Sequence, residues 1–402
     1  MSMENKAPLT LVKSPRDERD WHYGSIVAAQ EKLPARVSMR EESGPIRAQG
    51  EAGFCHSFAG TALKNLQETQ EWGRREFDFS PLALARAVKA RDGIVHTEGS
   101  TLLDVCKALC EDGVFDEAFY PYDQYQAGSL LFPPMRTEDF PNLPLYFCKN
   151  YARLDTLEDL KQALARKKPV LLGITCGEGI RKPEEGCVGL PFGEFIIGGH
   201  GVLVIGYDDE KEATVKGRQY RGFLECQNSW GEQYGEGGYF WLPYEYLTYR
   251  TKDFGMGFLM DMYTAVDLEQ EELAGTALEL FLGSRIAYDD GKEIYLEQEP
   301  IADERTGRTL VPLRFVGEGL GCDVRWNAAE RSILIRREER YIRLKIGSEI
   351  AEVDGREQRI EQAPILDART GRTLIPLRFV AQTLGNPVLW DGRRRKIIIL
   401  KR

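Results

Sequence analysis

Four residues in the N-terminal two thirds of the chain have the types and order needed for thiol chemistry. Cys55 follows a glycine-bearing loop and opens a helical stretch, so free backbone N–H groups and the helix dipole favour its thiolate. His200 precedes one apolar run and Asn228 ends another. A reactive cysteine needs a base close to it, and an asparagine amide can orient that base. The pattern predicts nucleophilic attack on a carbonyl, with the Gln49 amide and the Cys55 N–H as the two donors to the oxyanion.

Gly53, Gly199 and Trp230 are predicted to line the substrate-binding site, and the family resemblance described below adds Gly99. The glycines have no side chain and therefore leave room for a substrate backbone to approach. Trp230 follows the candidate asparagine by two positions, and we expect it to cover the histidine–asparagine contact and exclude water.

The elements that must position these residues change in type along the chain. Helical spacing appears first and strand-like apolar runs follow, which predicts an α+β body with two lobes. The expected helices are 55–71, 81–90 and 102–112, and the expected strands are 170–175, 202–207, 223–227 and 238–242.

An internal repeat organises the C-terminal part. Residues 308–316 return as residues 372–380, an offset of 372 − 308 = 64, and no insertion interrupts the correspondence. Each copy is predicted to be a ββ–helix–ββ unit, with a strand at 280–287 and a hairpin turn at Asp290-Gly291 in the first copy. The helix is expected at 313–320, and the two copies are expected to pack together.

The predicted domain division follows from these signals. Residues 1–265 form the body, in which residues 1–32 are an N-terminal strap that packs on the surface. Residues 266–277 are a linker, and the two repeats occupy 278–338 and 341–402.

Composition excludes several classes of protein. The chain has 402 residues, a formal net charge of −10 and 42% hydrophobic residues, which indicates a globular protein of more than one domain. The charge pattern is too weak to predict nucleic-acid binding, and no apolar run is long enough for a membrane-spanning helix. No signal peptide is recognised. The location of the protein therefore stays open. The sequence as given is compatible with the cytoplasm, and a sequence from which a signal had been removed would be compatible with secretion or the cell surface.

Eight cysteines are too few for a disulfide scaffold in a chain of this length. Cys106 and Cys110 are four residues apart on one predicted helix face, but no partner motif completes a zinc site. We expect buried free thiols, and no metal or cofactor.

Three sequence blocks together resemble the papain-like cysteine peptidases. They are Gln-Gly-x-x-Gly-x-Cys-x-Ser-Phe from Gln49, a histidine before an apolar strand that ends in Gly-Tyr, and Asn-Ser-Trp-Gly followed by Gly-Glu-Gly-Gly-Tyr. The resemblance covers about residues 33–263. It implies a helical lobe and a β-barrel-like lobe, and an endopeptidase that cleaves peptide or protein substrates through a thioester, without a cofactor.

The chain also departs from the pattern of that family. His56 stands where plant and animal members usually have tryptophan, and Ala52 replaces a disulfide cysteine of many secreted members, so the sequence is more similar to bacterial members. The segment before Leu33 is too short for the family's helical propeptide.

The 64-residue repeats resemble the small stalk-like domain named after the N-terminus of bacterial copper amine oxidases. The shared features are the Thr-Leu-Val/Ile-Pro-Leu-Arg-Phe block, Gly321 and Gly385, and Trp326 and Trp390. No histidine follows His200, so the repeats contain no imidazole for copper. The resemblance implies adaptor or substrate-holding modules, with a cell-surface or protein partner.

Two other functional classes stay open. An acyl transferase or peptide ligase would use the same residues, because an amine can take the thioester in place of water. A catalytically silent binding or scaffold protein would keep the fold without the chemistry.

Overall fold

A computed structural model describes residues 7–15, 20–73, 77–135, 142–250, 257–265, 276–303, 306, 308–391 and 395–401. The chain divides into two compact units. One comprises Met1–Gly24 and Ala29–Asp267, and the other comprises Ser25–Ala28 and Leu268–Arg402. Of the predicted linker at 266–277, residues 266–275 lie outside the described residues.

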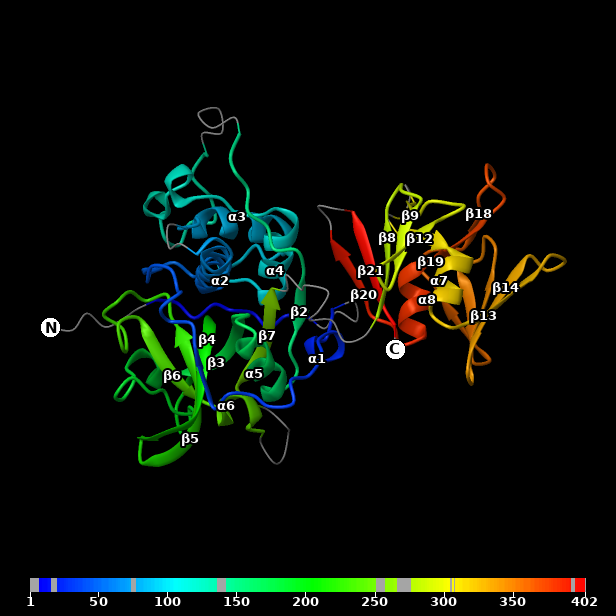
Figure 1. The fold of residues 1–402 in the computed structure, drawn as a ribbon. Helices are drawn as coiled ribbons and strands as arrows, with labels where there is room; N and C mark the ends of the chain where they lie inside the picture. Colours follow the sequence, from blue (N-terminus) through cyan, green and yellow to red (C-terminus); the bar gives the residue numbers. More distant parts are fainter. Residues whose placement is uncertain are drawn as a thin grey trace. The chain divides into compact units, whose positions relative to one another are not determined.

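The first unit begins its core with three helices, α2 (Cys55–Trp72), α3 (Pro81–Arg91) and α4 (Leu102–Glu111) (Figure 1). The hydroxyls of Ser80 and Thr101 cap the starts of α3 and α4 by accepting backbone N–H groups. Gly73 ends α2 in the left-handed conformation, with φ 65°. The three predicted helices are confirmed, each to within one residue.

A seven-stranded antiparallel sheet forms the other lobe of this unit, in the order β2-β7-β3-β4-β5-β6, with β1 paired to β4. All four predicted strands are confirmed, and the longest, β4, extends well beyond its predicted bounds. The strands are β1 (Arg36–Ser38), β2 (Tyr151–Arg153), β3 (Val170–Gly177), β4 (Ile196–Val215), β5 (Arg218–Gln227), β6 (Tyr239–Pro243) and β7 (Leu259–Ala265).

Short helices complete the unit: α5 (Leu157–Ala165), α6 (Glu245–Thr248) and the 3-10 helices η1 (Glu117–Phe119), η2 (Tyr122–Gln124) and η4 (Glu178–Arg181). The residues of the short helix α1 (Tyr23–Ile26) are divided between the two units. Helix α2 packs on β4, which brings the helical lobe and the sheet lobe together. The α+β fold with a helical lobe and a β-rich lobe is therefore confirmed.

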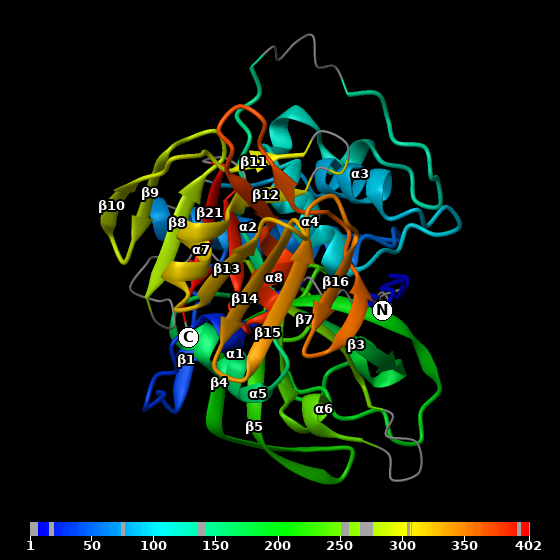
Figure 2. The same cartoon turned by 90° about the vertical axis from the view of Figure 1, so that its right-hand side faces the viewer.

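The second unit contains both repeats and three described sheets (Figure 2). Its helices are α7 (Leu313–Gly319) and α8 (Leu377–Thr383). Its strands are β8 (Ala277–Phe281), β9 (Ile286–Asp289), β10 (Lys292–Tyr295), β11 (Ile301–Ala302), β12 (Thr309–Pro312), β13 (Asp323–Asn327), β14 (Ser332–Arg337), β15 (Arg340–Lys345), β16 (Ile350–Val353), β17 (Arg356–Arg359), β18 (Ile365–Leu366), β19 (Thr373–Pro376), β20 (Val388–Asp391) and β21 (Lys396–Leu400).

The two copies exchange strands. One five-stranded sheet has the order β10-β9-β8-β21-β20 and the other β13-β14-β15-β16-β17, so each combines three strands of one copy with two strands of the other. The third sheet, β11-β12-β19-β18, joins the copies through an antiparallel pair in which Val311 faces Ile375, its equivalent at an offset of 64. The copies form a single hydrophobic core.

The predicted strand at 280–287 is wrong in its extent. The chain turns at Gly283, with φ 74°, so that β8 and β9 are two antiparallel strands and each copy has more strands than the predicted ββ–helix–ββ unit. A left-handed glycine reverses the chain where apolar residues on both sides suggested one continuous strand. The Asp290-Gly291 hairpin is confirmed between β9 and β10.

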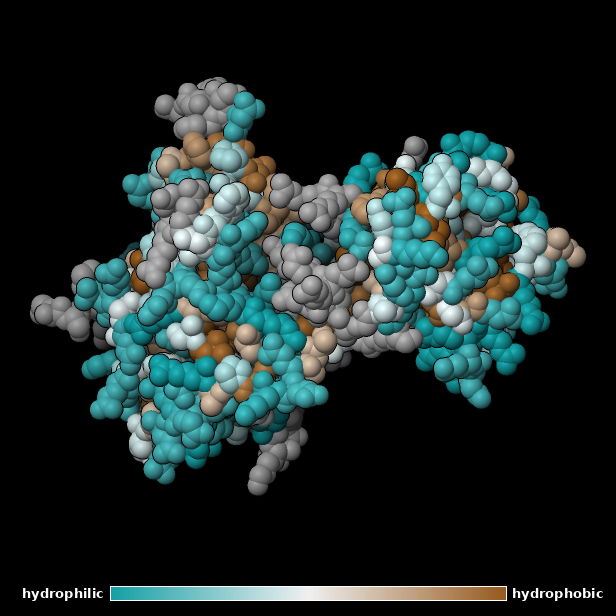
Figure 3. Space-filling view, in the orientation of Figure 1, coloured by the Kyte–Doolittle hydropathy of each residue, from teal (hydrophilic) through white to brown (hydrophobic). Residues whose placement is uncertain are grey.

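Hydrophilic residues dominate the visible surface of both units (Figure 3). Among the described residues, no helix is both long and apolar enough to cross a membrane.

Candidate active site

Cys55 is the first residue of α2. Phe54 is the N-cap, and no side chain caps the start of the helix. The Cys55 side chain is fully buried. Backbone hydrogen bonds from Gly201, His56 and Thr10 favour the thiolate, but burial outweighs them and raises the pKa of Cys55 to about 11.

His200 lies on β4, opposite Ile174 of β3. Its Nε2 lies 2.8 Å from Asn228 Oδ1. An amide oxygen only accepts hydrogen bonds, so this contact assigns the ring proton to Nε2 and leaves Nδ1 as an acceptor. Nδ1 is buried and has no hydrogen-bond partner among the described residues. Burial lowers the pKa of His200 to about 4, although the bond to Asn228 opposes that shift.

Trp230 covers the imidazole. The two ring centroids are 4.7 Å apart with 31° between the planes, and Tyr234 packs edge-on against the other side of Trp230. The Trp230 ring therefore lies against the imidazole that bonds to Asn228.

Gln49 is held on both sides of its amide group. Its Nε2 donates to Ala52 O at 2.7 Å, and its Oε1 accepts from Ser229 Oγ at 2.6 Å. The backbone adds a bond from Gln49 N to Ser229 O at 2.8 Å. Sequence reasoning missed Ser229, although its place directly after Asn228 was the available signal.

The three predicted glycines lie around the N-terminal strap. Gly53 O accepts a 2.7 Å hydrogen bond from Thr10 Oγ1, and Gly199 O accepts one of 2.9 Å from Leu11 N. A Cβ built on Gly99 would lie 1.9 Å from Thr10 O. All three positions therefore contact the N-terminal segment, Gly53 through the Thr10 side chain and Gly99 and Gly199 through the main chain.

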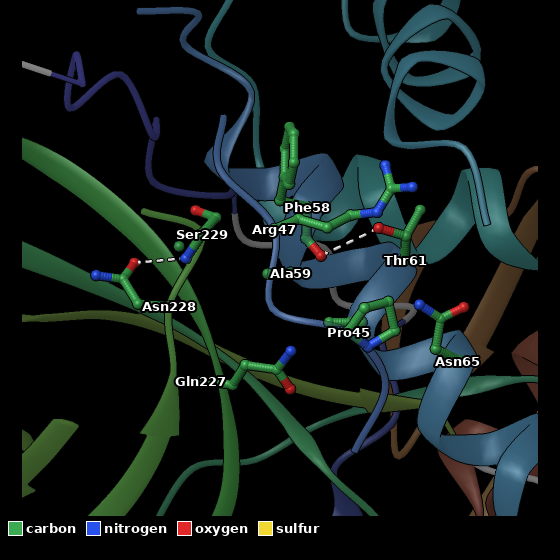
Figure 4. Close-up of a pocket in the computed structure, with 11 residues that line it drawn as sticks. Pro45, Arg47, Phe58, Ala59, Thr61, Asn65, Gln227, Asn228 and Ser229 are labelled. Carbon is green, nitrogen blue, oxygen red and sulfur yellow. Dashed lines mark hydrogen bonds between the residues drawn. The ribbon is translucent and has the colours of Figure 1, made fainter. Parts of the chain in front are cut away.

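A small cavity lies between the strands and α2, and Asn228 is among the residues that line it (Figure 4). Figure 4 shows Gln227, Asn228 and Ser229 on the strand side, and Phe58, Thr61 and Asn65 on the helix. Gln227 Oε1 and Asn228 Nδ2 have no hydrogen-bond partner among the described residues. Asn228 Oδ1, by contrast, accepts hydrogen bonds from His200 Nε2 and from Ser229 N, each at 2.8 Å.

His56 follows Cys55 and is also fully buried, and both of its ring nitrogens lack a partner among the described residues. Burial lowers its pKa to about 3. In the described part of the chain, no three metal-ligating side chains cluster. The Cys106 side chain is buried and the Cys110 side chain is half-buried.

Comparisons with known proteins assign families to both parts of the chain. Residues 33–251 match the family described as "Papain family cysteine protease", which covers more than half of the chain. Residues 272–329 and 288–399 match "Copper amine oxidase N-terminal domain".

Individual relatives are more distant. An uncharacterized peptidase C1-like protein of Acanthamoeba polyphaga mimivirus is 25% identical over 213 residues, which is 50% of this chain and 64% of that protein. Cathepsin S of Bos taurus is 24% identical over 245 residues, which is 59% of this chain and 69% of that protein. The chain thus spans about two thirds of the length of these relatives.

Among solved structures, xylellain, a cysteine protease from Xylella fastidiosa, aligns with 67% of this chain and 99% of its own. The TM-score is 0.54 and the sequence identity is 24%, a likeness that concerns the fold.

Proposed function

Because the chain belongs to the papain family of cysteine proteases, we propose that it hydrolyses peptide bonds with Cys55 as nucleophile, His200 as base and acid, and Asn228 as the residue that orients the ring. The 2.8 Å contact between His200 Nε2 and Asn228 Oδ1 carries this proposal, because it leaves Nδ1 free to take a proton from a thiol.

The reaction proceeds in two halves. The Cys55 thiol transfers its proton to His200 Nδ1, and the thiolate attacks the peptide carbonyl carbon. The imidazolium then protonates the leaving amine as the C–N bond breaks, and a thioester remains on Cys55. His200 next removes a proton from water, which attacks the thioester and releases the carboxylate product.

Gln49 and the Cys55 backbone N–H stabilise the oxyanion in both halves. The Gln49 amide has two N–H bonds, of which one is directed to Ala52 O. The second is available to a substrate oxygen, and Ser229 holds the amide in place from its oxygen side. A donor that is already oriented costs little reorganisation during the reaction.

The proposed peptidase domain is residues 1–265, with the repeats as adaptor or substrate-holding modules. The candidate catalytic residues all precede Ala265, and the repeats have a core of their own. A chain that ends after residue 265 should therefore keep its kcat/KM on small peptides. Loss of that activity in a folded truncation would assign the repeats to the active site.

Cys55→Ala is the direct test. Hydrolysis of a fluorogenic peptide should disappear, while the circular dichroism spectrum and melting temperature stay close to those of the parent. Cys322→Ala is the matched control, because it removes another buried free thiol from the second unit. Activity that survives Cys55→Ala would refute the proposal. Transfer of the acyl group to an added amine, detected by mass spectrometry, would identify a ligase instead.

A further inference from the structure

Glu98 is a buried carboxylate in the loop between α3 and α4, and the residue is 8% exposed. Both of its oxygens accept hydrogen bonds. Oε2 accepts one from Gly53 N, and Oε1 accepts one from Tyr125 Oη at 2.9 Å and one from Gly128 N at 2.7 Å. The carboxylate therefore connects the loop before Cys55 to the segment that follows η2.

The Gly53 N–H belongs to the same peptide group as the Ala52 carbonyl. Ala52 O accepts the 2.7 Å hydrogen bond from Gln49 Nε2. One peptide group is therefore held at both ends, by Glu98 through its N–H and by the Gln49 amide through its oxygen. Because a trans peptide group is planar, its N–H and C=O point in opposite directions, and neither can turn without the other.

This connection fixes the direction of the proposed oxyanion donor. If the peptide between Ala52 and Gly53 turned over, Gln49 Nε2 would face an N–H group and lose its acceptor. The amide could then rotate, and its second N–H would no longer be directed to a substrate oxygen. Glycine resists such a turn less than any other residue, so hydrogen bonds must supply the restraint. A bond from an N–H to a carboxylate is roughly twice as strong as a neutral one.

Two tyrosines hold the carboxylate and the loop in place. The ring of Tyr125 packs against that of Phe54, the N-cap of α2, with centroids 4.9 Å apart. Burial, together with the bond to Glu98, raises the pKa of Tyr125, so its hydroxyl stays protonated and donates. Tyr122 Oη donates to Gln49 O at 2.9 Å. One tyrosine therefore restrains the loop directly and the other restrains it through Glu98.

We propose that Glu98 is a positioning residue of the peptidase, which orients the peptide between Ala52 and Gly53 and thereby aims the Gln49 amide at the oxyanion. This inference rests on the proposed peptidase function. Glu98 acts through Gln49 and makes no contact of its own with the substrate, so its effect should appear in steps that place negative charge on the carbonyl oxygen.

Glu98→Gln in the full-length chain is the first test, because it keeps the size of the side chain and removes the charge. A carboxamide has one acceptor oxygen, and its NH2 group only donates. If that oxygen faces Tyr125 and Gly128, it keeps two hydrogen bonds, and the NH2 group then lies against the Gly53 N–H. Hydrolysis of a fluorogenic peptide should therefore show kcat about tenfold below that of the parent and KM within about twofold of it.

Two further measurements separate positioning from general damage to the site. A peptide aldehyde adds to the Cys55 thiol and places its oxygen where the oxyanion forms, so its inhibition constant should rise about tenfold in Glu98→Gln. Iodoacetamide alkylates the same thiol by displacing iodide, without an oxyanion, so its rate should stay within about twofold of the parent. Similar losses in both measurements would indicate a displaced Cys55 and would overturn the positioning role.

A double-mutant cycle tests the route through Gln49. In a chain that already carries Gln49→Ala, the addition of Glu98→Gln should change the affinity for the aldehyde by less than about twofold, because the group that Glu98 positions is absent. If Glu98→Gln lowered the affinity by the same factor in both backgrounds, Glu98 would act independently of Gln49 and the proposal would be wrong.

Glu279→Gln is the matched control, because Glu279 is also buried, pairs with Lys396 at 2.9 Å and belongs to the second unit. It should leave kcat, aldehyde affinity and alkylation rate within about twofold of the parent. Glu98→Asp serves in case Glu98→Gln does not fold. It keeps the charge but shortens the side chain by one CH2 group, so kcat and aldehyde affinity should each fall by about threefold.

The outcomes separate the two proposals. Hydrolysis that depends on Cys55, with kcat and aldehyde affinity unchanged in Glu98→Gln and Glu98→Asp, would refute the role of Glu98 and leave the peptidase intact. A parent that binds the aldehyde but cleaves no peptide would refute the peptidase, and the aldehyde affinities of the variants would still decide the role of Glu98. A parent that does neither would refute both proposals.

Discussion

Ser229 Oγ donates a 2.6 Å hydrogen bond to Gln49 Oε1, across 180 residues of sequence. Both side chains are buried. Backbone bonds from Gln49 N to Ser229 O and from Gly231 N to Arg47 O fasten the same two segments together. The proposed oxyanion donor is therefore tied directly to the residue that follows the proposed ring-orienting asparagine.

Ser229→Ala should lower kcat by about fivefold with little change in KM, because the Gln49 amide loses one of its two side-chain contacts. The bond to Ala52 O and the backbone pairing remain, so the effect should be smaller than that of removing Gln49. Steady-state kinetics on a fluorogenic peptide measure it. Ser57→Ala is the control, since that buried hydroxyl has no hydrogen-bond partner among the described residues. Equal losses in the two variants would contradict the positioning role.

Gln49→Ala should reduce kcat by about 100-fold, the scale expected when one oxyanion donor is lost. Asn228→Ala should cost less, because β4 and the Trp230 ring still restrain His200. The two variants are compared under saturating peptide. If Asn228→Ala were the more damaging, the assigned division of roles would be wrong.

His56 should make the fold sensitive to acid. Its pKa is lowered to about 3 by burial, whereas the ring in the unfolded chain titrates near 6.5. As the pH falls, the unfolded state therefore binds the proton before the folded state does. The contribution of His56 to the free energy of unfolding is complete above pH 6.5 and is lost progressively as the pH drops toward 3. Each buried histidine contributes at most about 1.4 kcal/mol per pH unit, and His200 acts in the same direction.

His56→Phe removes the titratable ring from the core and replaces it with an apolar ring. The gain in melting temperature over the parent should be small at pH 7.5 and should grow steadily down to pH 4.5. His96→Gln, which changes an exposed histidine, should follow the parent curve. If the melting temperatures of His56→Phe and the parent differed by the same amount at every pH, the difference would come from packing, and this would argue against titration of His56.

One 64-residue copy should not fold as a monomer. Residues 276–338 alone would lack the two strands that β20 and β21 add to β8, and would leave β14 without β15. A chain of residues 276–401 should give a cooperative melting transition and elute as a monomer. The single copy should be unfolded or form a strand-exchanged dimer. A folded monomer of one copy, seen by size exclusion and circular dichroism, would contradict this.

The candidate catalytic residues and most elements of the first unit were predictable from sequence because their signals are local. A cysteine at a helix start, capping hydroxyls at Ser80 and Thr101, and strands that read as apolar runs each act within a few residues. The pairing of His200 with Asn228 was expected because a catalytic imidazole needs a group that orients it, whereas the structure alone shows that the bond is made through Nε2.

Tertiary structure alone decided which partners those elements took. The two copies have the same apolar pattern at an offset of 64. A strand could therefore pair equally well within its own copy or with the other copy as far as its local sequence is concerned. The exchange of strands depends on which arrangement closes the shared core. Likewise, Thr10 and Leu11 have no distinctive local pattern. Their place at Cys55 depends on glycines far along the chain that admit a close backbone. Long-range packing, which depends on the whole chain at once, therefore determined which segment lies at Cys55, whereas the candidate site residues could be named from the sequence alone.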